Sequence, residues 1–374
     1  MSFDAIWHFA LGVGDDNPLW WDQDYASRTP LGRMCAPPTF LYSCSSGGLA
    51  PGEIAVGEAP EELLPDRLGL WASDRWVWHA RAWLGEDISA TTEVWDVTDR
   101  RGTSGRRSVG QVDKIAYQTG SGRLLAECFQ TNVFVPRMRL KPTAEAPDLP
   151  MPTYGAAYRS RLSRQYETEI AQRRGTKARY WDDVRVGDSL GVLGKGPLTL
   201  TSMVGWLLGC GSPLCRTNRM AYQLLQARPG LRLMNPDTGV EDTLAASHWD
   251  PYFIAKSGLA RGYDYGSQRI SWMAHLLTDW AGDEGFLSEL EVKLRQPNFF
   301  GDTTWITGEV TGKGTDDQGS FVQCSMQAEN QRGTISTQAT AKIRLPTKLG
   351  KRSRHTENAA HTLHPSEIAE TSQR

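Results

Sequence analysis

The sequence lacks the features that would place it in several protein classes at once. It carries almost no net charge, since 41 Lys and Arg stand against 43 Asp and Glu. A strongly basic surface for nucleic acid or an anionic membrane is therefore not expected. No apolar run is long enough to span a bilayer, no Asn-x-Ser/Thr sequon occurs, and the opening MSFDAIWHFALGVG has an acid where a signal peptide has basic residues. We expect a soluble, cytoplasmic protein.

Metal and phosphate motifs are also missing. The six cysteines are scattered, and Cys210 and Cys215 have no histidine or second cysteine pair at ligand spacing. Free thiols in a reducing compartment, and no metal site, are expected. The glycine- and lysine-containing stretch GVLGKGP (191–197) lacks phosphate-loop spacing and is interpreted as a turn at a strand end.

The length of 374 residues suits two domains. Four prolines in KPTAEAPDLPMPT (141–153) indicate a linker, and the polar residues 154–174 indicate an exposed helix. The last residues have little apolar content. We predict an N-terminal domain over 1–140, a linker and helix over 141–175, a C-terminal domain over 176–346 and a disordered tail over 347–374.

Both halves follow the same plan. Residues 91–135 and 303–345 each read as strand, turn, strand, turn, strand, with glycines in the turns and alternating Val, Ile, Phe and Thr. In the second half, SQRISWMAHLLTDWAG (267–282) precedes the strands and has apolar residues at helical spacing. The pattern predicts an α+β fold in which an antiparallel sheet wraps a long helix in each half, the arrangement called a double hot dog.

An internal repeat strengthens this prediction. When the chain is shifted by 228 residues, LWWDQDYASRTPLGRMCAPP (19–38) falls on SHWDPYFIAKSGLARGYDYG (247–266). Trp21 then meets Trp249, and Asp22 meets Asp250. Few other positions are identical, but the shared order of strands and turns supports a duplication.

The mismatches in this repeat are informative. Trp20 meets His248, and a histidine can transfer protons near neutral pH whereas a tryptophan cannot. Pro38 meets Gly266, and only the glycine has an N–H to offer to a developing oxyanion. The first half therefore reads as a degenerate copy, and the second half as the active one.

These motifs resemble those of a known family. GDDNPLWWDQDYA (14–26) is similar to the G-D-x-N-P-L-H-x-D signature of the MaoC-like, R-specific enoyl-CoA hydratases, with Trp20 in place of the histidine, and HWDPYFIAKSGLARGYDYG is similar to its later part. APPTF (36–40) resembles the FAS1-like dehydratase half of double hot-dog acyl dehydratases. RYWDDVRVGDSL (179–190) and GDTTWITGEV (301–310) resemble the opening and central strand of a MaoC-like domain.

The resemblance implies a fold and a reaction. Two hot dogs would pack side by side as a pseudo-dimer, and the enzyme, a lyase of lipid metabolism, would hydrate an enoyl thioester or dehydrate a 3-hydroxyacyl thioester. CoA would be part of the substrate, with no other cofactor, and a homodimer of the double hot dog is a further hypothesis. His248 would activate water, and Gly266 would donate its amide to the thioester oxygen. The short, glycine-broken segment TFLYSCSSGGLAPG (39–52) further suggests a bulky or long acyl group in a tunnel lined by Trp20, Trp21 and Phe40.

The acid that pairs with His248 departs from the family pattern. The family places its aspartate five residues before the histidine, where this chain has Thr243. We favour Asp242 as the catalytic acid, with Glu241, Asp15 reaching across, Asp250, or no acid as alternatives. The earlier stretch VGWLLGCGSPLC (204–215) resembles the start of the signature and carries Cys210 and Cys215 where the acid and the base would stand.

The remaining candidates have structural alternatives. Tyr265 could line the pocket or simply pack, and Asp250 before a proline suits a helix cap. Asp15 and Asn17 are named as substrate-binding candidates, with Trp20 and Trp21 beside them, but they also suit a capped turn. His248 itself could be a core histidine, although its spacing to Gly266 favours catalysis. Two other functions stay open: a thioesterase on the same fold, and a non-catalytic subunit that completes a partner's site.

Overall fold

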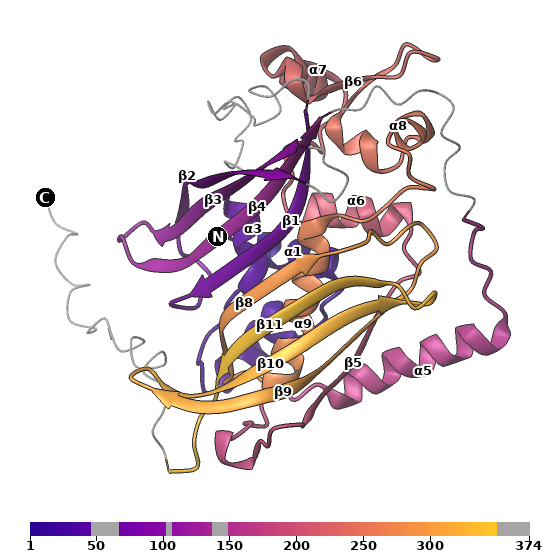
Figure 1. The fold of residues 1–374 in the computed structure, drawn as a ribbon. Helices are drawn as coiled ribbons and strands as arrows, with labels where there is room; N and C mark the ends of the chain where they lie inside the picture. The colour runs from indigo at the N-terminus through magenta and orange to yellow at the C-terminus, as the bar shows by residue number, and fades with distance from the viewer. Residues whose placement is uncertain (46–66, 102–106, 137–148, 350–374) are drawn as a thin grey trace, which may run out of the picture.

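One antiparallel sheet runs through both halves of the protein (Figure 1). The computed structural model describes residues 1–45, 67–101, 107–136 and 149–349. In this described part the sheet has nine strands in the order β2-β3-β4-β1-β8-β11-β10-β9-β5. They are β1 (Arg67–Trp78), β2 (Ile88–Arg101), β3 (Arg107–Thr119), β4 (Leu124–Pro136), β5 (Ser189–Lys195), β8 (Phe286–Leu294), β9 (Thr304–Asp316), β10 (Gly319–Asn330) and β11 (Ile335–Arg344).

The two halves meet at the β1–β8 pair. These strands are antiparallel, with Ser73 opposite Lys293 and Val77 opposite Glu289. Strand pairing therefore continues without a break from the first half into the second. The predicted α+β double hot dog is confirmed, and its two sheets are fused edge to edge. The sequence pattern did not predict β1, the strand that forms this junction.

Helix α9 (Gly266–Ala281) is the central helix of the second half and lies behind the strands in Figure 1. Ile270, Met273 and Leu277 on it are fully buried. On β10, Val322 and Cys324 are buried while Gln323 between them is exposed, which is the period of two expected for a sheet with one covered face. The predicted long helix is confirmed.

The repeat is visible in the structure. In the first half a 3₁₀ turn, η1 (Pro18–Trp20), precedes α2 (Gln23–Arg28), and in the second η5 (Leu244–His248) precedes α8 (Pro251–Lys256). Isolated antiparallel bridges join Cys35 to Trp83 and Tyr263 to Phe299, and Cys35 and Tyr263 are again 228 residues apart. In the first half, η2 (Pro38–Leu41) and α3 (Tyr42–Ser45) follow. The rest of the predicted tunnel segment, 46–52, lies outside the described residues.

Two glycines bring the halves into close contact. Helix α1 (Phe3–Val13) packs on α6 (Leu200–Gly209). A Cβ on Gly209 would lie 2.4 Å from the carbonyl oxygen of His8, and one on Gly12 would lie 3.0 Å from the carbonyl oxygen of Gly205. The backbones touch directly, so no side chain fits between them.

An insertion separates α6 from η5. It contains α7 (Asn218–Ala227), η4 (Pro229–Leu231) and the short hairpin β6 (Arg232–Met234) and β7 (Glu241–Thr243). In Figure 1 this insertion lies beyond one end of the sheet, together with α8. It divides the part of the second half that resembles the family signature into two pieces.

The predicted exposed helix is α5 (Ala156–Gln172), followed by η3 (Trp181–Asp183). It lies beside the edge strand β5 (Figure 1), and Glu169 accepts a hydrogen bond from the Gly194 amide at 2.6 Å. Most of the predicted linker, 141–148, and the tail from 350 on lie outside the described residues. Among the described residues, no helix is long and apolar enough to cross a membrane.

Candidate active site

His248 is the last residue of η5 and is half-buried. Its Nδ1 lies 3.1 Å from the carbonyl oxygen of Tyr263, and its ring lies 4.3 Å from the Tyr263 ring and 4.0 Å from the Tyr265 ring. A carbonyl oxygen only accepts, so Nδ1 carries the hydrogen and Nε2 keeps its lone pair. Burial lowers the pKa of His248 to about 4. The imidazole is therefore neutral at pH 7 and able to accept a proton.

The N-terminus of α9 adjoins this histidine. Tyr265 is the N-cap residue, and no side chain caps the helix. The first amides of a helix have no partner within it, so they can bind a negative oxygen. A Cβ at Gly266 would lie 2.7 Å from Cδ1 of Leu294 and 3.4 Å from Cγ of Trp71. Gly266 is therefore fixed by packing between the halves and is the first residue of α9; the role of its amide stays a prediction.

Tyr265 supports a polar site. Its hydroxyl is buried and forms no hydrogen bond with the described residues, and burial raises its pKa. A buried hydroxyl without a partner costs about 1–3 kcal/mol. Of the two predicted roles, lining a site explains this hydroxyl better than packing does, since packing alone would leave the cost uncompensated.

The structure does not bring Asp242 to His248. Asp242 is exposed on β7, and its Oδ1 accepts from the Thr243 amide at 2.6 Å. Within the described chain, no hydrogen bond or ion pair joins it to the histidine. Glu241 lies 3.3 Å from Arg232, and Asp250 caps α8 by accepting from the Tyr252 amide at 2.8 Å. The interpretation of Asp250 as a helix cap is confirmed, and the pairing of Asp242 with His248 is not.

Ser212, rather than Cys210, occupies the position in the second half that corresponds to Asp15 in the first. The amides of Asp15 and Ser212 donate equivalent bonds, to Ala10 and Leu207 at 2.9 Å. Both side chains then accept from the amide two residues on, at 3.1 Å for Asp15 and 3.3 Å for Ser212. The expectation for Cys210 was wrong because its spacing was counted without this turn, which begins at Gly211 with φ of 65°.

In the first half, the aromatic residues close the corresponding site. Trp20 is 1% exposed, and its Nε1 donates to Asp15 Oδ2 at 2.9 Å. Asn17 caps η1 by accepting from the Leu19 amide, which confirms the capped turn. Trp20 and Phe40 fill the core instead of lining an open tunnel, because Phe40 packs edge-on against Phe9 at 5.6 Å. That part of the tunnel prediction was wrong.

Trp21 lies apart from this core. It is 38% exposed and packs against Trp7 with ring centroids 5.7 Å apart. Its Nε1 donates to the carbonyl oxygen of Asp16 at 3.2 Å. A role for Trp21 in substrate binding stays a prediction.

Asp15 belongs to a buried network that the sequence did not reveal. His275 Nε2 lies 3.5 Å from Asp15 Oδ1 and 3.3 Å from Asp279 Oδ2. Its Nδ1 lies 2.8 Å from Lys195 Nζ, and Arg173 Nε lies 3.1 Å from Asp279. His275 and Asp279 stand four residues apart on α9, so their side chains share one face of the helix, and that spacing is a signal that could have predicted part of the network.

The hydrogen-bond partners of Lys195 determine which ring nitrogen of His275 carries the hydrogen. Lys195 Nζ also lies 3.0 Å from the carbonyl oxygen of Val13 and 2.9 Å from that of Gly14. The three hydrogens of an ammonium match these two oxygens and His275 Nδ1. His275 then carries its hydrogen on Nε2, between the two carboxylates. Although Asp15, His275 and Asp279 have the spacing of metal ligands, Nε2 has no lone pair for an ion in this arrangement.

The network predicts a pH dependence of stability. Burial lowers the pKa of Lys195 to about 8, below the value of about 10.4 expected in the unfolded chain. The folded protein loses this proton first, so its free energy of unfolding rises with pH between about 8 and 10, by roughly 2 kcal/mol. Chemical denaturation of wild type and Lys195→Met across this range measures the effect, which we expect to be absent in the variant. Parallel curves would contradict it.

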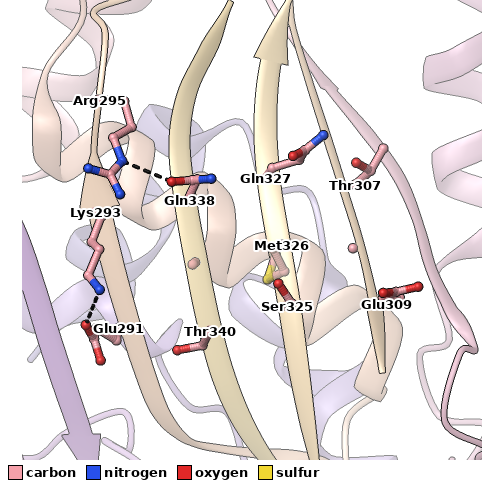
Figure 2. Close-up of a pocket in the computed structure, with 12 residues that line it drawn as sticks. Glu291, Lys293, Arg295, Thr307, Glu309, Ser325, Met326, Gln327, Gln338 and Thr340 are labelled. Atoms are coloured by element: carbon pink, nitrogen blue, oxygen red, sulfur yellow. Dashed lines mark hydrogen bonds and ion pairs between the residues drawn. The ribbon is translucent and has the colours of Figure 1, made fainter. Parts of the chain in front are cut away.

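A polar pocket of about 520 Å³ lies on the face of the sheet away from α9 (Figure 2). Figure 2 shows its side chains standing on the second-half strands. Lys293 lies 3.2 Å from Glu291, and Arg295 donates to Gln338 at 3.0 Å. Its lining contains no histidine or cysteine, Lys293 and Glu291 form an ion pair, and Arg295 is hydrogen-bonded to a neutral amide. His248, in contrast, has a free lone pair beside an open helix end.

Comparison with known proteins supports the fold. A family model described as "FAS1-like, dehydratase domain region" matches residues 2–124. A structure named "MaoC-like dehydratase" is 17% identical, with a TM-score of 0.61 over 92% of this chain and 94% of that one. The chain has the double hot-dog fold of the MaoC-like dehydratases. Among curated proteins, none matches it.

Two further structures share this MaoC-like fold. A conserved hypothetical protein from Mycobacterium tuberculosis, described as a double hot dog, is 14% identical with a TM-score of 0.55, over 92% of each chain. A putative MaoC domain dehydratase from Chloroflexus aurantiacus is 13% identical with a TM-score of 0.51, over 93% of this chain and 92% of that one. At these identities the likeness concerns the fold, and the resemblance inferred from the sequence motifs agrees with it.

Proposed function

We propose that the protein reversibly hydrates an enoyl thioester, with His248 as the base. The observation that carries this proposal is the neutral imidazole of His248 beside the uncapped N-terminus of α9. A base and an amide donor for an oxyanion are the two groups that this addition needs. The dehydratase names of the family model and of proteins with the same fold add support.

The proposed chemistry uses only protons. His248 Nε2 takes a proton from water while the hydroxyl oxygen bonds to C3, and the π electrons of the C2–C3 bond move toward the thioester carbonyl. The resulting enolate oxygen is stabilised by the Gly266 amide and the positive end of α9. The imidazolium then returns its proton to C2. No step requires a metal or redox cofactor, and CoA enters only as part of the substrate.

Among the described residues, no hydrogen bond or ion pair joins a carboxylate to His248, and this shapes the proposal. Ser212 stands at the position that corresponds to Asp15 in the first half, and the Tyr265 hydroxyl has no partner among the described residues. We propose that Tyr265 orients the substrate or the water, while the backbone oxygen of Tyr263 fixes the tautomer of His248.

An assay with the purified chain tests this function. Crotonyl-CoA, a long-chain enoyl-CoA and a cyclic enoyl-CoA are followed by the loss of the conjugated thioester absorbance, with free thiol measured in parallel. Hydration without thiol release supports the proposal. Thiol release would indicate a thioesterase, and no turnover with any of the three would indicate a non-catalytic subunit. A higher kcat/KM for the long or cyclic substrate would support the bulky acyl group, while the homodimer stays a prediction.

The pH profile gives a sharper test of His248. Because its pKa is about 4, the base stays neutral well below pH 6. We expect kcat/KM at pH 5 to remain within about twofold of its value at pH 7. A base with the ordinary pKa of about 6.5 would be largely protonated at pH 5, and the rate would fall about 25-fold from its value at pH 7. An acid limb between pH 6 and 7, with the fold intact by circular dichroism, would contradict the assignment.

A further inference from the structure

A cleft of about 590 Å³ lies between the two halves, away from the lining of the proposed active site. Helices α1, α5, α6 and α9 and strand β5 surround it, and His248 is not among its lining residues. Gln268 and Asp279 on α9 both line it. At 1.5 Å per residue, the cleft therefore follows α9 for about 16 Å.

The walls of the cleft are mainly apolar. Leu193, Leu198 and Trp272 line its interior, and Leu11 and Ile170 at its edge are 55% and 62% exposed. Exposed apolar side chains around a cleft favour an apolar ligand, since binding removes their surface from water.

Gly205 leaves room in this cleft, although no neighbouring atom requires a glycine at this position. It lies in the interior of α6, and a Cβ there would meet no atom within 4 Å. Gly209 on the same helix differs, because α1 presses against it. A glycine inside a helix costs about 1 kcal/mol relative to alanine. Gly205 carries this cost without a close neighbour, and the space that a side chain would occupy there faces the cleft.

Gln268 supplies an unused hydrogen-bond acceptor. It is 1% exposed, and its Oε1 forms no hydrogen bond with any described residue. Its Nε2 reaches only the carbonyl oxygen of Ser202, at 3.5 Å. A buried amide oxygen without a donor is unfavourable, and a donor on a ligand in the cleft would satisfy it.

The charged groups that line the cleft already have hydrogen-bond or ion-pair partners. Lys195 already faces two carbonyl oxygens and His275, and Arg173 is paired with Asp279 and Asp16. Glu169 accepts from the Gly194 amide and from Gln165. An ionic ligand would have to break these contacts, so the cleft favours a neutral one.

We propose that this cleft binds a neutral amphiphile, an apolar chain that carries one hydroxyl or amide N–H donor. The chain lies along α9 over Gly205 and against Trp272, and the donor bonds to Gln268 Oε1. The site is separate from His248 and does not depend on the hydratase function.

Octan-1-ol tests the proposal against its isomer 1-methoxyheptane, which has the same atoms but no donor, and against octanoate, which is charged. Calorimetry should show the alcohol binding at least fivefold more tightly than either. In the Gln268→Met variant, the affinity for octan-1-ol should fall to the affinity for 1-methoxyheptane. Gly205→Leu should weaken binding at least tenfold by filling the cleft, whereas Gly155→Leu, also in open space but outside the cleft, should bind as wild type does.

His248→Ala separates the two proposals, because it should bind octan-1-ol normally whatever its effect on turnover. Equal binding of alcohol and ether by the wild type would overturn the role of Gln268. Unchanged binding by a folded Gly205→Leu variant, or tighter binding of octanoate, would overturn the site itself.

Discussion

Replacing His248 by alanine is expected to lower kcat for enoyl-CoA hydration by about 10²–10⁴-fold, the usual contribution of a positioned acid–base group. The imidazole holds a basic lone pair next to the open end of α9, and alanine has no group that could take the proton of water. Thermal stability should change little, since the side chain makes one hydrogen bond, to the Tyr263 carbonyl oxygen. Initial rates with the best substrate, together with a melting curve, measure both effects.

His248→Gln serves as the matched variant. Its amide can still donate to the Tyr263 carbonyl oxygen, but it cannot accept a proton, so the rate should stay as low as in His248→Ala. A histidine elsewhere, His79→Ala, should keep full activity, because His79 lies on the first half and pairs with Glu127 at 3.1 Å. Retention of more than about a tenth of the activity in His248→Ala would show that another group is the base.

Gly209→Ala is expected to destabilise the protein by about 3 kcal/mol, at the upper end for overpacked sites. The added methyl group would lie 2.4 Å from the carbonyl oxygen of His8 and 3.2 Å from Cα of Gly12. Both atoms are backbone, so α1 and α6 must separate, and the packing between the halves loosens. Chemical denaturation measures the change in the free energy of unfolding. The expected loss is a net value, because the higher helix propensity of alanine offsets up to about 1 kcal/mol of the cost of overpacking.

Gly205→Ala is the control on the same helix. Its Cβ would meet nothing within 4 Å, so the variant should be as stable as wild type or more stable by up to about 1 kcal/mol. Equal stability of the two variants would show that the close contact at Gly209 can relax without cost.

The sequence by itself determined the fold class and the duplication, and it named the two positions on which the proposed function rests. Strand alternation and the apolar spacing of 267–282 are local patterns, so they predicted the sheets and α9 without knowledge of packing. The 228-residue repeat placed His248 and Gly266 together because both halves keep the same turn, helix and bridge. The substitution of Trp20 for the histidine marked the first half as degenerate, and the structure shows Trp20 buried against Asp15.

Only the tertiary structure decided the partners of these residues. Spacing along the chain suggested Asp242, but its carboxylate is exposed on β7 and forms no hydrogen bond or ion pair with His248 among the described residues. Asp15 instead meets His275, 260 residues later, a contact set by the packing of α1 and α9 across the halves. The protonation of His248 and Lys195 depends on burial and on backbone carbonyl oxygens from distant segments. Burial and contacts between segments are properties of packing, so no local pattern in the sequence could predict them.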